Sequence, residues 1–287
     1  MTVLEVIRRS AEFFEKKGVD SPRLQAELLL GHLLQVPRMQ LYLNFERELA
    51  PAELDAFREL VKRRGQREPL QQIVGSTSFC GLEISVTRDV LVPRPETELL
   101  AEQACVLLTE LASSTAPQPM ALDFGTGSGC VVAALAHKCP AARFMAVDVS
   151  AQALKVAREN ASRHDLAERI QFVQGSGFEA LPAGMHFDLI VSNPPYIPSG
   201  DLAGLQPEVR DFEPREALDG GPDGLDFYRR FAAEAGAWLR TSGKIMLEFG
   251  DEQAPALRKI FEQQNWIVER IVEDYTQRPR ILIATHG

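Results

Sequence analysis

The sequence predicts an α/β protein: a doubly wound, mainly parallel seven-stranded sheet, preceded by a small all-helical N-terminal domain. Helical periodicity alone fills roughly the first 70 residues. From Met120 onward, short apolar segments of strand character alternate with helical segments, which is typical of a parallel sheet covered on both faces. The last two predicted strands have no helix between them, so they should form an antiparallel end of the sheet.

The N-terminal helices are predicted from apolar spacing and from helix-start signals. Val3 and Ile7 begin a series of apolar residues at helical intervals. A second helix should start at Asp20-Ser21-Pro22, where a capping residue precedes a proline at the first helical position, and a third should open at Pro51. Nothing in this region has catalytic spacing, so we assign residues 1–70 to a helical domain.

A linker is expected over residues 71–94. Between positions 72 and 86, short extended stretches are interrupted by glycine-containing turns, which predicts a hairpin. The proline-rich segment that follows cannot be a helix interior. A helix over about 95–111 should then open the second domain, residues 95–287.

The second domain contains the alternating pattern, with one apolar run for each predicted strand. The predicted strands are 120–124, 143–147, 170–174, 187–192, 243–249, 266–272 and 280–285, and the predicted helices lie near 129–138, 151–162, 225–239 and 252–264.

Composition disfavours several classes of function. The chain has 31 basic and 40 acidic residues and a formal charge of −9, so it should not bind nucleic acid stably through the phosphate backbone, although a local basic patch stays open. No apolar run approaches the ~20 residues of a membrane span, and three glutamates near the N-terminus argue against a signal peptide, so a cytoplasmic protein is expected. Four cysteines without C-x-x-C spacing and five scattered histidines predict no metal site.

A glycine-rich turn follows the first predicted strand, at Gly125-Thr126-Gly127-Ser128-Gly129. Glycines allow a tight turn and let backbone amides approach a ligand at a helix N-terminus. Asp148 ends the next strand, where an acidic side chain binds ribose hydroxyls in doubly wound folds. Together these features indicate a cofactor with an adenosine moiety. A dinucleotide is the alternative, but Cys130 stands where that motif needs glycine and Asp123 favours S-adenosylmethionine.

A second motif, Asn193-Pro194-Pro195-Tyr196, follows the fourth predicted strand, so it should lie beside the cofactor at the carboxyl edge of the sheet. The Asn193 side chain and the Pro194 carbonyl can accept both hydrogens of an –NH₂ group, and Tyr196 offers a flat face for stacking. Such acceptors suit a planar nitrogen on which positive charge grows during methyl transfer. For this motif taken alone, the alternative interpretation is a turn that the two prolines make rigid and that has no catalytic role.

Several segments together resemble one family. The release factor glutamine methyltransferases (PrmC/HemK) have similar motifs, and the resemblance covers nearly the whole chain, including the helical domain and the linker. The N-P-P-Y motif is shared with DNA adenine and RNA guanine methyltransferases, whereas P-R-P-E-T-E with A-L-D-G-G is more specific. The matching segments are V-P-R-P-E-T-E (92–98), D-F-G-T-G-S-G (123–129), N-P-P-Y-I-P (193–198), E-P (213–214), A-L-D-G-G (217–221) and D-G-L (223–225).

The resemblance implies transfer of a methyl group from S-adenosylmethionine to the side-chain amide nitrogen of the glutamine in the Gly-Gly-Gln motif of bacterial class 1 peptide chain release factors. The N-terminal helices would help to dock the factor. The implied catalytic residues are Asn193, Pro194 and Tyr196, the implied substrate-binding residues are these three and Pro195, and the implied cofactor-binding residues are Gly125, Thr126, Gly127, Ser128, Gly129, Asp148, Gly177 and Asn193.

One departure from the family concerns the adenine. The family commonly has an acidic or amide residue and then an aromatic residue after the third strand, where this chain has Ser176 and Gly177. The adenine contact is therefore expected to be backbone-mediated, with Phe178 as the nearest ring. Two questions stay open at this point: whether the substrate is instead an adenine or guanine of nucleic acid, and whether residues 201–224 close over the substrate or form a solvated loop.

Overall fold

The computed structural model describes residues 1–114 and 118–287, and the chain forms two compact units. One unit, called here the helical unit, contains Met1–Ser76 together with Gln206–Phe212. The other, called the sheet unit, contains Thr77–Leu205 and Glu213–Gly287. The chain therefore leaves the sheet unit for seven residues and returns to it, which the sequence patterns did not predict.

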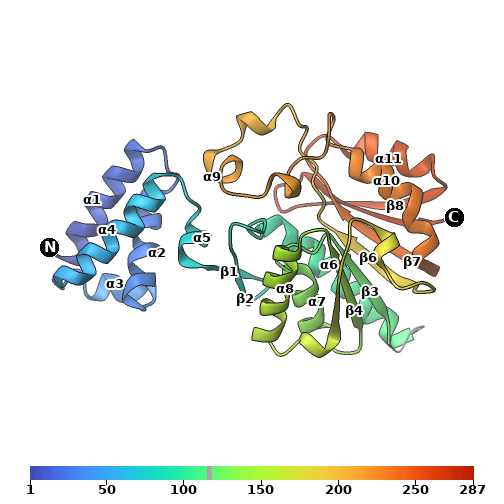
Figure 1. Ribbon diagram of the computed structural model, residues 1–287, viewed down its shortest axis with the longest axis horizontal. Helices are drawn as coiled ribbons and strands as arrows, with labels where there is room; N and C mark the ends of the chain where they lie inside the picture. The colour runs from blue at the N-terminus through green and yellow to red at the C-terminus, as the bar shows by residue number, and fades with distance from the viewer. Residues whose placement is uncertain (115–117) are drawn as a thin grey trace. The chain divides into compact units, whose positions relative to one another are not determined.

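The helical unit is built around an apolar core that includes Phe14, Leu29, Leu30 and Phe57. Helix α1 begins with a capping box in which Thr2 and Glu5 satisfy each other's backbone N–H groups. The helices are α1 (Val3–Lys16), α2 (Pro22–Leu34), α3 (Arg38–Leu43), α4 (Pro51–Gly65), α5 (Leu70–Val74) and, from the returning segment, α9 (Pro207–Arg210), and most are labelled in Figure 1.

The predicted start of α2 is correct in position but not in chemistry. Pro22 is the first helical residue, as expected. Ser21 adopts a left-handed conformation with φ 50° and its side chain makes no capping hydrogen bond. The Asp20 carboxylate instead accepts a hydrogen bond from Gln206 at 3.3 Å.

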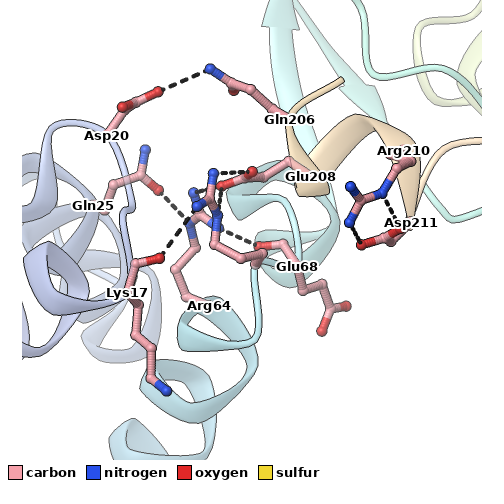
Figure 2. A network of polar contacts seen from close by, with 10 residues as sticks. Lys17, Asp20, Gln25, Arg64, Glu68, Gln206, Glu208, Arg210 and Asp211 are labelled. Carbon is pink, nitrogen blue, oxygen red and sulfur yellow. Dashed lines mark hydrogen bonds and ion pairs between the residues drawn. The ribbon is translucent and has the colours of Figure 1, made fainter. Parts of the chain in front are cut away.

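A buried ion cluster holds the returning segment within the helical unit. Arg64 and Arg67 both donate to the Glu208 carboxylate, at 2.7 Å and 2.5–2.7 Å. Figure 2 shows Arg64 between Glu208, the Gln25 side chain and the Glu68 carbonyl, which accept its N–H groups. Burial by itself would raise the pKa of Glu208, but the hydrogen bonds from the two arginines outweigh burial and lower it. The Glu208 carboxylate therefore neutralises the guanidinium of Arg64, which is almost fully buried.

The sheet unit confirms the predicted fold class. Its seven strands lie in the order β5-β4-β3-β6-β7-β9-β8, and all neighbours are parallel except the two pairs that involve β9. The antiparallel end was therefore predicted correctly. The strands are β3 (Met120–Phe124), β4 (Arg143–Asp148), β5 (Ile170–Gln174), β6 (Phe187–Ser192), β7 (Leu239–Glu248), β8 (Trp266–Glu273) and β9 (Pro279–His286).

Alternate residues of the strands belong to two separate cores. Ala121 and Leu189 pack with the helices of one face, whereas their neighbours Leu122 and Ile190 pack with those of the other. Both faces are thus covered, as a parallel sheet requires. Helices α6 (Pro95–Ser114) and α7 (Cys130–Lys138) contribute to the first core, as does the end of α8 (Ala151–Arg163), while α10 (Asp226–Glu234) and α11 (Ala254–Glu262) contribute to the second.

The linker hairpin is shorter than predicted. Only β1 (Ser76–Phe79) and β2 (Leu82–Ser85) pair, and residues expected to begin the hairpin form α5 instead. The Asn160 side chain of α8 both accepts from and donates to the backbone of Ser85. These bonds fix the end of the hairpin against the sheet unit, in which β2 lies.

The ion cluster generates a prediction for stability. Glu208→Gln keeps the side-chain shape but leaves Arg64, whose side chain is 5% exposed, without a counter-charge. We expect the variant to lose about 3 kcal/mol of unfolding free energy, the usual cost of breaking a buried pair. Urea denaturation measures this loss, and hydrogen exchange should show residues 206–212 as the part that becomes unprotected.

Asp211→Asn is the matched control, because Asp211 lies in the same segment but forms an exposed ion pair with its neighbour Arg210. It should leave the denaturation midpoint unchanged. Equal midpoints for both variants would show that the Glu208 cluster does not hold the segment.

Candidate active site

A cavity of about 260 Å³ opens at the carboxyl ends of β3, β4, β5 and β6. The strand order reverses beside β3, and ligands of doubly wound sheets bind at such a position. The cavity is lined by seven parts of the sheet unit: Asp89–Leu91 with Pro93, Arg94 and Thr97; Asp123–Ser128 with Cys130 and Val131; Val147–Ser150 with Ala153; Gly175 and Ser176; Ser192–Pro195; Pro214, Glu216 and Ala217; and Phe227.

The glycine turn is held against the end of β4 by backbone hydrogen bonds. The N–H groups of Gly125 and Thr126 both donate to the Val147 carbonyl, at 2.8 and 3.1 Å. Gly127 has φ 55°, a left-handed conformation that favours glycine. Gly129 also has a positive φ, and a Cβ there would lie 2.9 Å from the Cβ of Ala157 in α8. All three glycines of the turn thus have conformations that favour glycine, and Gly129 is also needed for close packing.

Asp123 supports the turn from inside the protein. Its carboxylate accepts hydrogen bonds from the Thr126 hydroxyl at 2.7 Å and from the Val132 N–H at 3.2 Å. Burial raises the pKa of Asp123 to about 7. These contacts fasten the strand, the turn and the start of α7 to one another.

Asp148 has the geometry of a group that binds two hydroxyls. Its Oδ2 accepts from the Gly127 N–H at 2.8 Å and its Oδ1 accepts from the Ser150 N–H at 2.9 Å. Burial raises the pKa of this carboxyl, and the two backbone hydrogen bonds oppose that effect. Each oxygen keeps a lone pair for a further donor, which matches the two hydroxyls of a ribose.

The aromatic rings that line the cavity are not the one that the sequence predicted. Phe178 is buried among other aromatic side chains and does not line the cavity, and Gly177 does not line it either. Gly175 and Ser176 are the lining residues after β5, and Phe124 and Phe227 are the lining rings. A Cβ at Gly177 would meet Arg230 of α10, so this residue faces the Arg230–Glu179 salt bridge and not the cavity.

The N-P-P-Y motif contributes three of its four residues to the same cavity. Asn193, Pro194 and Pro195 line it, and the Asn193 Nδ2 donates to the Thr97 hydroxyl oxygen at 3.0 Å. Tyr196 does not line the cavity: its carbonyl accepts from Gln253 at 3.0 Å, and burial raises the pKa of its phenol to about 12. Tyr196 is half-buried against the second core and does not line the cavity, so the predicted stacking face is not part of the cavity wall.

Neither reading of residues 201–224 describes the segment fully. Its first part contributes Gln206–Phe212 to the helical unit. Its second part returns to the cavity, where Pro214 and Ala217 are lining residues. The buried Glu213 carboxylate accepts from Arg94 with both oxygens, at 2.7 and 2.9 Å. The segment therefore contributes to both the helical unit and the cavity wall.

Thr97, Arg94 and Phe227 are site residues to which the sequence patterns assigned no role. Thr97 and Arg94 belong to the P-R-P-E-T-E segment, so a signal was present, but only as a family resemblance. Phe227 follows D-G-L in the first turn of α10 and carries no recognisable motif. Their roles depend on contacts between segments more than 90 residues apart in the chain, such as that of Thr97 with Asn193.

No group of three metal-ligating side chains occurs within residues 1–114 and 118–287. In the same residues, no helix is long and apolar enough to span a membrane. Cys130 and Cys139 are buried, whereas Cys80 and Cys105 are partly exposed.

Two family models match the chain. The PrmC N-terminal domain matches residues 5–75, and the methyltransferase small domain matches residues 101–203. A solved methyltransferase from Pyrococcus furiosus is similar in fold, with a TM-score of 0.52 and 21% identity over 72% of this chain and 90% of that one. The hMettl16 catalytic domain in complex with MAT2A 3'UTR hairpin 1 is also similar, with a TM-score of 0.56 and 16% identity over 85% of each chain.

Curated relatives are much more similar in sequence. A release factor glutamine methyltransferase of Chlorobaculum tepidum is 44% identical over 97% of this chain and 95% of its own length. One of Geobacter sulfurreducens is 46% identical over 91% of this chain and 89% of its own length. Methyltransferases of this kind use S-adenosylmethionine as the methyl donor, and the Asp148 carboxylate beside the glycine turn fits its ribose. The chain therefore belongs to the release factor glutamine methyltransferase family.

Proposed function

We propose that this protein methylates the side-chain amide nitrogen of the glutamine in the Gly-Gly-Gln motif of bacterial class 1 peptide chain release factors. The observation that carries the proposal is that Asn193, Pro194 and Pro195 line the same cavity as the glycine turn and Asp148. The names of the relatives support the choice of a release factor glutamine as substrate. Because release factors act on ribosomes, the reaction takes place in the cytoplasm.

The residues of the cavity divide into two groups. Residues 125–128 and Asp148 bind the cofactor, with the Asp148 carboxylate on the ribose hydroxyls, while Gly129 does not line the cavity and packs against Ala157. Gly175 and Ser176 take the place proposed for Gly177 beside the adenine, in a cavity that the rings of Phe124 and Phe227 also line. Asn193 and Pro194 hold the substrate amide through their side-chain and backbone oxygens.

S-adenosylmethionine supplies a methyl group on a positively charged sulfur. An amide nitrogen is a weak nucleophile because its lone pair is delocalised, so the protein's contribution is orientation and charge stabilisation. Asn193 and the Pro194 carbonyl accept the two N–H hydrogens and hold the nitrogen in line with the methyl group. With the cofactor bound, the bond between this nitrogen and the methyl group would form as the bond between sulfur and the methyl group breaks, and the two oxygens would stabilise the positive charge on the nitrogen. The methylated nitrogen would be strongly acidic and would give its extra proton to water, so no strong base is needed.

Labelling of candidate substrates tests the proposed function. The protein is incubated with methyl-labelled S-adenosylmethionine and, separately, with a release factor, duplex DNA and ribosomal RNA. We expect label in the factor alone, at the glutamine of Gly-Gly-Gln, and none in a factor in which that glutamine is alanine. Label in either nucleic acid would instead support an adenine or guanine methyltransferase, which the formal charge of −9 disfavours.

Asn193→Ala should separate catalysis from cofactor binding. Removal of one oxygen that binds the substrate amide should lower kcat by about 100-fold or more, the usual effect of losing a preorganised polar contact to developing charge. The dissociation constant of S-adenosylmethionine, measured by calorimetry, should change by less than about threefold. Equal losses in both quantities would show that Asn193 shapes the cofactor pocket instead.

Asp148→Asn should have the opposite effect. It removes the charge that accepts ribose hydroxyls, so the dissociation constant of S-adenosylmethionine should rise by about 10-fold or more, while kcat at saturating cofactor stays near that of the wild type. Asp188→Asn is the control, because Asp188 also accepts a backbone N–H, that of Met120 at 2.8 Å, but does not line the cavity. Similar weakening in both variants would remove Asp148 from the cofactor site.

A further inference from the structure

A chain of buried polar groups lies behind Asn193. Asn193 follows β6, Thr97 lies in the first turn of α6, and Glu248 ends β7. The Asn193 Nδ2 donates to the Thr97 Oγ1 at 3.0 Å. A hydrogen bond from the Thr97 side chain lowers the pKa of the Glu248 carboxyl, of whose two oxygens Oε2, and not Oε1, lacks a partner among the described residues. Thr97 and Glu248 are each 2% exposed. Neither group touches bulk water, so their hydrogen bonds are fixed by one another.

The donors and acceptors of these three side chains fix the direction in which the hydrogen bonds between them run. A carboxylate only accepts hydrogen bonds, and a threonine hydroxyl has a single hydrogen to donate. Thr97 gives that hydrogen to Glu248, so toward Asn193 it can only accept. The Asn193 –NH₂ group must therefore point at Thr97, which leaves the Oδ1 atom for the cavity that Asn193 lines. The opposite orientation would place N–H donors against the N–H donors of a substrate amide.

The hydrogen bonds around Glu248 satisfy only part of its buried carboxyl group. Its Oε2 is buried and has no hydrogen-bond partner among the residues that the structure describes, which is a cost to stability. The charged groups that act on it are Arg280 from β9 and Arg94 and Glu96 from the segment that starts α6. Burial raises the pKa of Glu248 to about 7, so the carboxyl is ionised and purely an acceptor at pH 8.

We propose that Thr97 and Glu248 are positioning residues that fix the amide orientation of Asn193 for the methyl-accepting nitrogen. The role of the substrate nitrogen rests on the proposed function, whereas the direction of the hydrogen bonds does not. The two parts are therefore tested by separate measurements.

Hydrogen exchange of the Asn193 side chain tests the direction without any substrate. The chain contains only four asparagines, so selective ¹⁵N-Asn labelling gives four side-chain –NH₂ signals, and Asn193→Ala identifies the one of interest. At pH 8, Thr97→Val, which keeps the shape but removes the acceptor, should speed exchange of this –NH₂ group by about tenfold. Thr97→Ser, which keeps the hydroxyl, should restore the wild-type rate. Equal rates in all three proteins would overturn the proposal.

Kinetics with a release factor test the consequence for catalysis. Thr97→Val should lower kcat by about 30-fold, and Thr97→Ser should stay within about threefold of wild type, because only the hydroxyl matters. Glu248→Gln should also lower kcat, because the amide of the glutamine can donate to Thr97 and reverse the direction of these hydrogen bonds. The dissociation constant of S-adenosylmethionine should stay within about threefold of wild type in all of them.

Tyr228→Phe is the matched control. The Tyr228 hydroxyl donates to the backbone carbonyl of Glu248 at 2.7 Å, so the variant loses a buried hydrogen bond to the same residue but leaves its side chain alone. It should lower Tm and keep kcat. If Thr97→Val and Glu248→Gln behave like this control, the two residues are merely structural and the proposal is wrong. If wild-type protein methylates no release factor while the exchange result holds, the proposed function fails and the hydrogen-bond direction stands.

Discussion

Three backbone N–H groups of the glycine turn donate to the last two residues of β4, to the carbonyl of Val147 and the carboxylate of Asp148. This seam joins the first two βα units of the sheet at their carboxyl ends, and the cavity depends on it. It sets the path of the chain into α7, it orients Asp148, and it determines how closely α8 approaches at Gly129. Two of these three hydrogen bonds join backbone groups only, so side-chain changes around them alter the cavity walls more easily than the cavity position.

Burial raises the pKa of two acidic side chains of the sheet unit, Asp123 and Glu248, which have different roles. Asp123 and Glu248 are both buried near the carboxyl ends of their strands, β3 and β7, and burial raises the pKa of each to about 7. Asp123 receives two hydrogen bonds and ties secondary structure together. Glu248 keeps one oxygen unpartnered, which local packing does not explain. The difference in hydrogen bonding, and not the pKa, separates a structural carboxyl from one that acts through another residue.

The strands, their alternation and the antiparallel end of the sheet were predictable, because each depends on local apolar periodicity. The glycine turn, Asp148 and Asn193-Pro194-Pro195 were predictable as cavity residues, because the carboxyl ends of parallel strands meet at one edge. Tyr196, Gly177 and Phe178 do not line the cavity, and no sequence pattern indicated this, because it depends on contacts with residues distant in the chain, such as that of Gly177 with Arg230. Thr97 and Glu208 were missed for the same reason: their partners lie 96 and up to 144 residues away.

The return of Gln206–Phe212 to the helical unit has a consequence for how the protein is made. Arg64 is synthesised 144 residues before Glu208, its buried counter-charge. At about 5–20 residues per second, a ribosome needs roughly 7–30 s to add that stretch. Throughout this interval Arg64 lacks the counter-charge of Glu208, so the N-terminal helices gain this ion pair only after residues 77–205 of the sheet unit have been made. A gene fragment that encodes the N-terminal helices alone would lack the ion pair, and we expect its product to be less stable than the helical unit of the whole chain.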